Sequence, residues 1–160
     1  MRPPILPVLE LTRLRTSEVD ALARMLAAVD RAGESRQFHP HPFARDHLET
    51  LCDKRRQDLY YVLATGDVVV GYGLLRGWDE GYTVPSLGLA VHPEHRRAGH
   101  GLVLMHFLHS AARVRGASRV RLRVRAGNDT AIGLYRAVGY QFEPTTDSDG
   151  LLVAYKSLAP

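Results

Sequence analysis

Seven consecutive residues, Arg119 to Arg125, alternate arginine with valine or leucine. Because successive side chains of a strand point to opposite faces, this period of two predicts a strand with one buried apolar face and one basic face. Helical patterns lie on both sides of it in the chain, over about 101–115 and 128–138. The run therefore indicates a sheet strand set between helices.

Other segments extend this pattern along the whole chain. The β-rich runs 59–65 and 68–78 are joined by Gly66-Asp67, a two-residue turn signal that predicts an antiparallel hairpin. Ser17 and Asp20 resemble a capping box that opens a helix. The other expected elements are strands over 8–14, 84–91 and 151–158 and near Tyr140, and helices ending at Gly33 and spanning 44–52. Strands interleaved with helices predict a mixed α/β sheet.

Composition restricts the environment and the partners. There are 21 lysines and arginines against 17 aspartates and glutamates, a formal net charge of +4 that favours anionic partners. The single cysteine, Cys52, excludes an intrachain disulfide or a multi-cysteine zinc site and indicates a cytoplasmic location. No apolar run reaches the ~18 residues of a membrane span, so no membrane partner is expected. His39 and His41 lack a third ligand at metal-site spacing, so no metal is expected, and His106 and His109 are expected to be exposed on a helix.

A basic turn with two glycines joins the strand ending near Val91 to a helix. Gly99 and Gly101 allow close approach of the backbone, and the free N–H groups and dipole of a helix N-terminus favour phosphate oxygens. Arg96 and Arg97 add positive charge. The spacing matches neither a P-loop nor a dinucleotide fingerprint. By itself the turn indicates either an anion site or a purely structural turn.

Two motifs together resemble the GNAT superfamily of N-acetyltransferases. Arg96-x-x-Gly99-x-Gly101 is similar to its pyrophosphate loop, and residues 128–140 are similar to its Asn…Ala-x-x-Leu-Tyr-x-x-x-Gly-Tyr segment. The resemblance covers about 8–158 and implies a single N-acetyltransferase domain over 1–160 with its core at 8–158. It implies a mixed α/β (α+β) fold whose mostly antiparallel sheet has about six to seven strands and about four flanking helices, splayed at the cofactor cleft.

The resemblance also implies acetyl-CoA as cosubstrate and assigns residues to it. In such proteins the loop amides hold the pyrophosphate, the preceding strand pairs with the pantetheine arm, and the asparagine contacts the cofactor. The implied cofactor-binding residues are Leu89, Ala90, Val91, Arg96, Arg97, Ala98, Gly99, His100, Gly101, Asn128 and Tyr135.

Acyl transfer needs a neutral amine, a donor for the developing oxyanion and a proton for the departing thiolate. By the resemblance Tyr135 is the general acid, and the strand amide near Leu89 is a plausible oxyanion donor. Many family members carry a glutamate on the strand before the loop, but residues 85–91 contain no carboxylate. Asp79 and Glu80 are therefore the candidate bases. His92, His39, His41 and a water-mediated route are alternatives, while Cys52, with no base motif beside it, is expected to be structural.

We therefore expect an acyltransferase that moves an acetyl group from acetyl-CoA to a primary amine of a small molecule or peptide by direct attack. The alternative is a catalytically silent acyl-CoA-binding or sensory domain that keeps the cleft but lacks a base. The arginines of 119–125 form either a solvated face or an anion-facing surface. Aromatic residues do not interleave with them, so a nucleic-acid partner is not expected. The acceptor, the acyl-chain preference and the assembly, monomer or homodimer, stay open.

Overall fold

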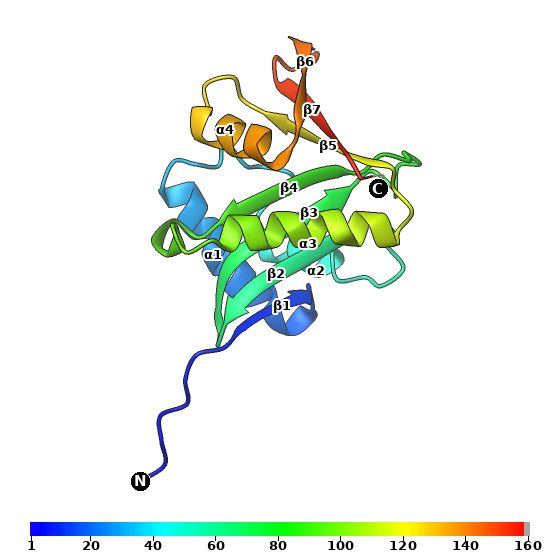
Figure 1. Cartoon of the computed structure of the whole chain (residues 1–160). Helices are drawn as coiled ribbons and strands as arrows, with labels where there is room; N and C mark the ends of the chain where they lie inside the picture. The colour runs from blue at the N-terminus through cyan, green and yellow to red at the C-terminus, as the bar shows by residue number, and fades with distance from the viewer. Residues whose placement is uncertain (159–160) are drawn as a thin grey trace.

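The computed structural model describes residues 1–158, and the last two residues of the expected 1–160 domain lie outside them (Figure 1). The strands form one seven-stranded sheet in the order β1-β2-β3-β4-β5-β7-β6. β4 and β5 pair in parallel, and the other neighbouring strands pair antiparallel. The mixed α/β fold class is therefore confirmed. The elements are β1 (Leu9–Arg13), a 3-10 turn η1 (Thr16–Glu18), α1 (Val19–Arg31), α2 (Arg45–Thr50), β2 (Leu59–Thr65), β3 (Val68–Arg76), β4 (Ser86–Val91), η2 (Pro93–His95), α3 (His100–Val114), β5 (Arg119–Val124), α4 (Asp129–Val138), β6 (Gln141–Thr146) and β7 (Leu152–Ser157).

Helices cover both faces of the sheet, with α3 in front of β3 and α1 and α2 behind it in Figure 1. Two glycines of β3 set the close approach of α3. A Cβ on Gly71 would lie 2.7 Å from Leu104 Cδ1, and one on Gly73 would lie 2.9 Å from Leu108 Cδ1. Real Cβ atoms do not approach other atoms so closely, so α3 lies directly on the backbone of β3 because these positions are glycine.

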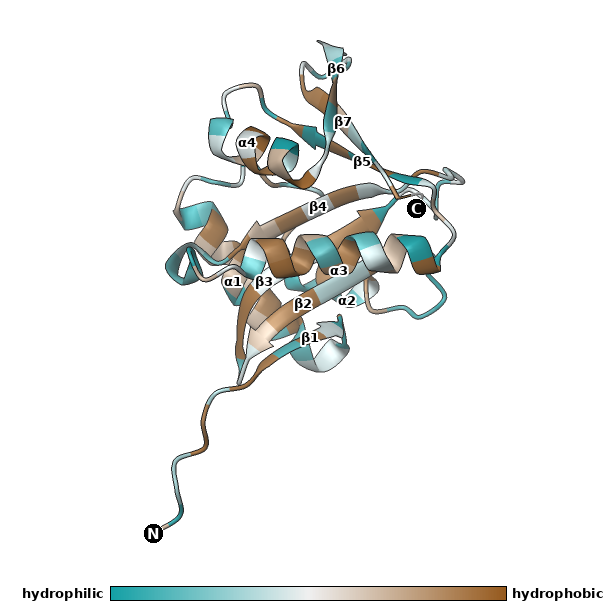
Figure 2. Cartoon of the chain, in the orientation of Figure 1, coloured by the Kyte–Doolittle hydropathy of each residue, from teal (hydrophilic) through white to brown (hydrophobic). Residues whose placement is uncertain are grey.

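Apolar side chains fill the layers on both sides of the sheet, and the central strands β3 and β4 are largely apolar along their length (Figure 2). α1 buries Leu22 and Leu26 against β2 and β3. On the other face, α4 buries Ile132 against Leu122 of β5 and Ala154 of β7. Among the helices formed by residues 1–158, none combines the length and the apolar character needed to cross a membrane.

The start of α1 differs from the expectation. The predicted capping box of Ser17 and Asp20 is wrong, because the reciprocal contact forms two residues earlier, between Arg15 and Glu18. The Glu18 carboxylate accepts the Arg15 backbone N–H at 3.1 Å and its guanidinium at 2.6 Å. This contact closes the 3-10 turn η1, and the α-helix begins only after it, at Val19.

Candidate active site

The parallel strands β4 and β5 part in the middle of the sheet, at a place that we call the fork. Within residues 1–158 their pairing is a single bridge between Ser86 and Arg121. The Arg121 N–H donates to Pro85 O at 2.9 Å, and beyond this point the two strands diverge (Figure 1). The predicted splay of the sheet is therefore present, with α3 over β4 and α4 over β5 on one face of it.

Alternate backbone groups of β4 point into the fork. At one end of the strand the His92 N–H donates to β3, whereas Pro85 O accepts a hydrogen bond from β5. Since backbone groups alternate sides along a strand, even-numbered residues bond to β3 and odd-numbered residues face β5. The N–H groups of Leu89 and Val91 therefore face the fork beyond the last strand bridge. The Ala90 backbone pairs with β3 instead.

The loop between β4 and α3 contains two left-handed backbone positions. Arg97 has a φ of 62° and Gly99 a φ of 81°. α3 begins at His100, and Gly99 at its N-cap supplies no side chain to the first amides. These N–H groups lie at the positive end of the helix dipole, where they have no intrahelical acceptor. The loop 96–101 therefore offers a concave set of backbone donors suited to phosphate oxygens.

The side chain of Arg96 is occupied by an ion pair. Its guanidinium makes a bidentate contact with the Glu34 carboxylate, with Nη1 2.6 Å from Oε1. Glu34 follows α1, so this pair fastens the loop to the segment that leads from α1 to α2. By contrast, the exposed Arg97 side chain makes no ion pair or hydrogen bond within residues 1–158. Of the two predicted loop arginines, Arg97 has its charge available.

Asn128 caps α4. Its side-chain oxygen accepts the Ala131 N–H at 3.3 Å, and its own backbone N–H donates to Arg125 O at 3.0 Å. This position fixes α4 to the end of β5 and leaves the amide NH2 of Asn128 as a donor. A helix-capping role is an ordinary one for asparagine. Its predicted contact with the cofactor stays a prediction.

Tyr135 is half-buried on α4. Its ring packs against Tyr140 with 5.7 Å between centroids, and burial raises the pKa of its hydroxyl. Both Tyr135 and Leu89 pack against one apolar cluster, whose buried members are Met105, Leu122, Val124, Ile132, Tyr140 and Ala154. The predicted general acid and the predicted oxyanion donor therefore lie on the same side of the sheet, next to the fork.

His109 contacts Tyr140 of this cluster, and the expectation that His109 is exposed was wrong. Its side chain is 2% exposed, and its Nε2 lies 2.7 Å from the Tyr140 hydroxyl. The three-residue spacing predicted the same exposure for His106 and His109. Only His109 is buried, because it contacts Tyr140, which precedes β6. Burial lowers the pKa of His109 to about 4, so the ring is neutral near pH 7.

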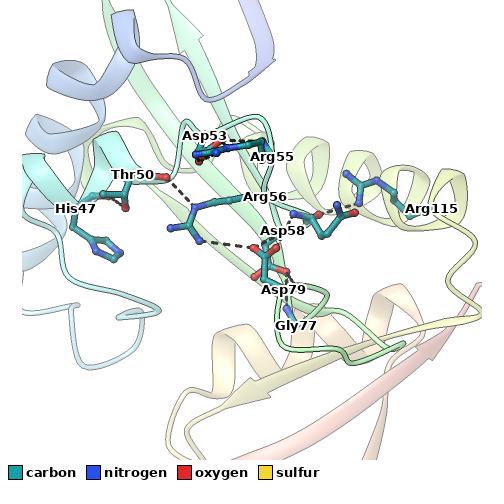
Figure 3. A network of polar contacts seen from close by, with 10 residues as sticks. His47, Thr50, Asp53, Arg55, Arg56, Asp58, Gly77, Asp79 and Arg115 are labelled. Atoms are coloured by element: carbon teal, nitrogen blue, oxygen red, sulfur yellow. Dashed lines mark hydrogen bonds and ion pairs between the residues drawn. The ribbon is translucent and has the colours of Figure 1, made fainter.

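Asp79, one of the two candidate bases, belongs to a network that ties the β3–β4 turn to the start of β2 (Figure 3). Its carboxylate accepts the backbone N–H of Gln57 at 2.8 Å and lies 3.8 Å from the Arg56 guanidinium. The buried Asp58 accepts in return from the backbone of Gly77 at 2.9 Å and of Asp79 at 3.1 Å. These contacts hold the turn that follows Arg76.

The other proton-relay candidates differ in their surroundings. Glu80 is exposed and lines a large cavity, as does His39. His41 is buried, with Nδ1 2.7 Å from Pro42 O and Nε2 2.8 Å from the Tyr72 hydroxyl, so neither of its ring nitrogens is available. His92 accepts the Glu94 N–H through Nδ1 at 3.1 Å. Within residues 1–158 no group of three or more histidine, cysteine, aspartate or glutamate side chains is placed to hold a metal ion.

The cavity lies on the face of the sheet opposite α4 and has a volume of about 1120 Å³. Its walls are the segment after α1, the turn after β3, and the facing edges of β4 and β5. Leu87 and Gly88 line it, so it opens onto the fork. Six arginines also line it: Arg36, Arg76, Arg119, Arg121, Arg123 and Arg125. The basic face of β5 is therefore a cavity wall.

The segment after α1 is fastened across the sheet at several points. Besides the pair at Glu34, the Arg125 Nε donates to Arg36 O at 2.6 Å, and the Arg76 guanidinium donates to Pro40 O. His41 then anchors the segment to β3 through Tyr72. Sequence reasoning missed Arg36 and Arg76 as site residues, because no local pattern distinguishes them from other surface arginines.

The sequence profile of the acetyltransferase (GNAT) family matches residues 25–140, which include both the loop 96–101 and the segment 128–140. The chain belongs to the GNAT family. Among curated relatives is an acetyltransferase of Yersinia pseudotuberculosis that is 30% identical over 88 residues, which are 55% of this chain and 61% of that protein. The match thus spans less than two thirds of the relative's length.

Solved GNAT structures share the fold over nearly the whole chain. The PaiA N-acetyltransferase from Thermoplasma acidophilum, in complex with coenzyme A, has a TM-score of 0.77 at 14% identity and covers 94% of this chain and 99% of its own. YncA from Salmonella typhimurium, with its cofactor acetyl-CoA, has a TM-score of 0.77 at 17% identity and covers 94% of both chains. At these identities the likeness shows that the GNAT fold is shared.

Proposed function

We propose that this GNAT protein transfers an acetyl group from acetyl-CoA to a primary amine by direct attack. The observation that carries the proposal is the fork between β4 and β5, which opens directly beside the loop 96–101. An extended arm can lie along the free edge of β4 while the loop amides bind a diphosphate. When bound, acetyl-CoA supplies the activated acetyl group as a thioester.

The residues of this chain fit such a ligand. Gly99 has a backbone conformation that favours glycine, and a Cβ there would meet nothing within 4 Å, so the space in front of the loop is open. Arg97 adds an available positive charge. The Leu89 N–H, which faces the fork, is the proposed donor to the oxygen that gains negative charge during transfer. The role of Ala90 is then limited to its side chain, because its backbone pairs with β3.

Tyr135 is the proposed general acid for the departing sulfur. Burial raises the pKa of the hydroxyl, so it holds its proton at neutral pH. We expect Tyr135→Phe to lower kcat by about 10²-fold or less, because one proton donor contributes about 10²–10⁴ and water can substitute in part. The measurement is thiol release under conditions in which the chemical step limits the rate.

Tyr61→Phe is the matched control for this substitution, because Tyr61 packs on Phe107 of α3, away from the fork. It should leave kcat unchanged. An unaltered chemical step in Tyr135→Phe would remove the general-acid role and leave the rest of the proposal in place.

Glu80 is the proposed base, acting directly or through water, because it lines the cavity that opens onto the fork. Asp79 is the less suitable carboxylate, since backbone amides and Arg56 already engage it. Asn128 is proposed to support the cofactor through the NH2 group that its capping contact leaves free.

The loop conformation gives a second test. We expect Gly99→Ala to weaken binding of coenzyme A by about tenfold. Alanine in the left-handed region costs about 1–2 kcal/mol, so the free loop of the variant relaxes out of the conformation that binds the diphosphate. Calorimetry with coenzyme A measures this change. Gly116→Ala is the control, because Gly116 has a similar φ of 83° and open surroundings but follows the far end of α3. Equal affinities of the two variants would show that the loop does not bind the cofactor.

A second candidate is a catalytically silent domain that binds acyl-CoA. It is favoured by the sequence of β4, which places no carboxylate on the strand beside the fork. The two functions differ in one experiment. Calorimetry that detects acetyl-CoA binding, combined with no thiol release over a broad panel of amines, would favour the silent domain.

A further inference from the structure

We infer that the acceptor of this acetyltransferase is a small primary amine that also carries an oxyanion group, a carboxylate or a phosphoryl group. The inference rests on the proposed function, because it assigns the acceptor to the cavity on the far side of the fork. It is carried by the six arginines that line the cavity and by the absence of an ion pair at five of them within residues 1–158.

The alternation of β5 directs its arginines into the cavity. Arg121 and Arg119 lie opposite Tyr155 and Ser157 in the ladder with β7, on the face away from α4. Intervening residues such as Leu122 are buried on the other face, beneath α3 and α4. The apolar half of the pattern therefore holds the strand in place. The basic half lines the cavity, and within residues 1–158 the side chain of Arg121 makes no hydrogen bond or ion pair there.

Few negative charges offset these arginines. Arg123 pairs with Asp147 and Asp149, each at 2.6 Å, so its charge is balanced. Within residues 1–158 the other five arginines of the cavity, Arg36, Arg76, Arg119, Arg121 and Arg125, make no ion pair. Among the residues of 1–158 that line the cavity, Glu80 alone carries a carboxylate. Cationic groups gathered in one cavity repel each other, and a bound anion relieves that repulsion.

Arg76 supplies an independent observation. One end of its guanidinium donates to Pro40 O, but its Nε is buried and has no hydrogen-bond partner within residues 1–158. Buried polar groups are normally hydrogen-bonded, and an orphaned N–H often indicates a ligand or a solvent molecule. Arg76 itself lines the cavity, and guanidinium groups bind carboxylate and phosphoryl oxygens, so an oxyanion suits the remaining N–H groups of Arg76.

Arg121 connects the cavity to the chemistry. Its backbone forms the last bridge between β4 and β5, opposite Ser86, and its side chain lines the cavity. An anion held by Arg121 would therefore place the rest of a small acceptor at the fork, beside Leu87 and Gly88. The volume of about 1120 Å³ lies just above the range of about 300–1,000 Å³ for small-molecule sites, which favours a small acceptor over an extended nucleic acid. A polyamine would meet charge of its own sign.

Matched acceptors test the inference. Thiol release from acetyl-CoA by the full chain is measured with an α-amino acid against its amide, with 2-aminoethylphosphonate against ethanolamine, and with spermidine. We expect the anionic member of at least one pair to have a kcat/KM about 10- to 100-fold above its neutral partner. The amino-acid pair and the phosphonate pair identify which oxyanion is used.

Arg121→Gln should lower kcat/KM for the preferred acceptor by about 10- to 100-fold, mostly through KM, and leave coenzyme A affinity unchanged. Arg36→Gln tests the same site from the other wall of the cavity. Arg24→Gln is the matched control and should behave as the wild type. Arg24 is an exposed arginine of α1 that does not line the cavity.

A binding experiment does not depend on turnover. With coenzyme A at saturation, so that the loop 96–101 is filled, inorganic phosphate is expected to raise Tm by about 2–5 °C. Arg121→Gln should abolish this rise, and Arg24→Gln should retain it. If phosphate failed to raise the Tm of the wild type, or failed to raise it in both variants, the proposal of an anion site would be overturned.

The outcomes separate the two proposals. Faster turnover of neutral amines or of spermidine would overturn the inference and keep the acetyltransferase. If coenzyme A does not bind, or binds without thiol release from any amine, the proposed function fails. The phosphate titration, repeated without coenzyme A if the cofactor does not bind, would then still decide whether the arginine cavity holds an oxyanion.

Discussion

Lowering the pH from about 6.5 to 4 is expected to destabilise the fold by roughly 3 kcal/mol for each of two histidines, His41 and His109. Burial lowers the pKa of each ring from 6.5 to about 4. The unfolded chain therefore takes up protons first as the pH falls. Their contribution to stability is complete above pH 6.5 and is lost by about pH 4.

The contacts of His41 explain why its protonation is unfavourable. Pro42 O can only accept, so Nδ1 carries the proton and Nε2 accepts from the Tyr72 hydroxyl. A proton on Nε2 would force that buried hydroxyl to turn and leave its own proton without this acceptor. The paired carboxylates act at lower pH, since the Arg55 and Arg123 guanidiniums lower the pKa of Asp53 and Asp147 to about 2.

Urea denaturation at pH 7, 5.5 and 4.5 measures this effect. His109→Gln should reduce the dependence of the unfolding free energy on pH by about half, because one of the two rings no longer titrates. Ser110→Ala changes an exposed side chain of the same helix that does not titrate, and it should leave the dependence unchanged. If the double variant His41→Gln/His109→Gln retains the full dependence, the buried histidines are not its source.

Local patterns predicted most of the fold because the elements are locally encoded. The alternation of residues 119–125 specified β5 and its two faces, and Gly66-Asp67 specified the β2–β3 hairpin, where Gly66 has a φ of 61°. The glycines of the loop 96–101 lie where α3 begins, as their spacing predicted. Each of these features depends on residues within one turn or one strand.

Features that depend on distant pairs could not be predicted in this way. The arginine Arg96 was expected to face the cofactor, but a glutamate after α1 engages its side chain. The basic face of β5 could have been a solvated surface, and it lines a cavity because Arg36 and the turn after β3 enclose it. The burial of His109 likewise depends on Tyr140, which reaches it from the start of β6.

Asp58→Ala is expected to lower the free energy of unfolding by about 2–4 kcal/mol, because it removes the acceptor of two backbone N–H groups. The Asp58 side chain is 4% exposed, and its Oδ1 accepts from Gly77 at 2.9 Å and from Asp79 at 3.1 Å (Figure 3). Gly77 has a φ of 119°, so this turn has a conformation that only glycine adopts with ease. Thermal unfolding should show a Tm about 5–15 °C lower.

The substitution should also change the acceptor site, since the turn that Asp58 holds contributes Gly77, Glu80 and Tyr82 to the cavity wall. At a temperature where the variant is folded, we expect a higher KM for the acceptor and an unchanged affinity for coenzyme A. Asp53→Ala is the control, because the Asp53 side chain is 39% exposed and its carboxylate bonds only to Arg55. If Asp58→Ala matched this control in both Tm and KM, the turn would be held by other contacts, and the support of the cavity wall by the carboxylate–amide network would be disproved.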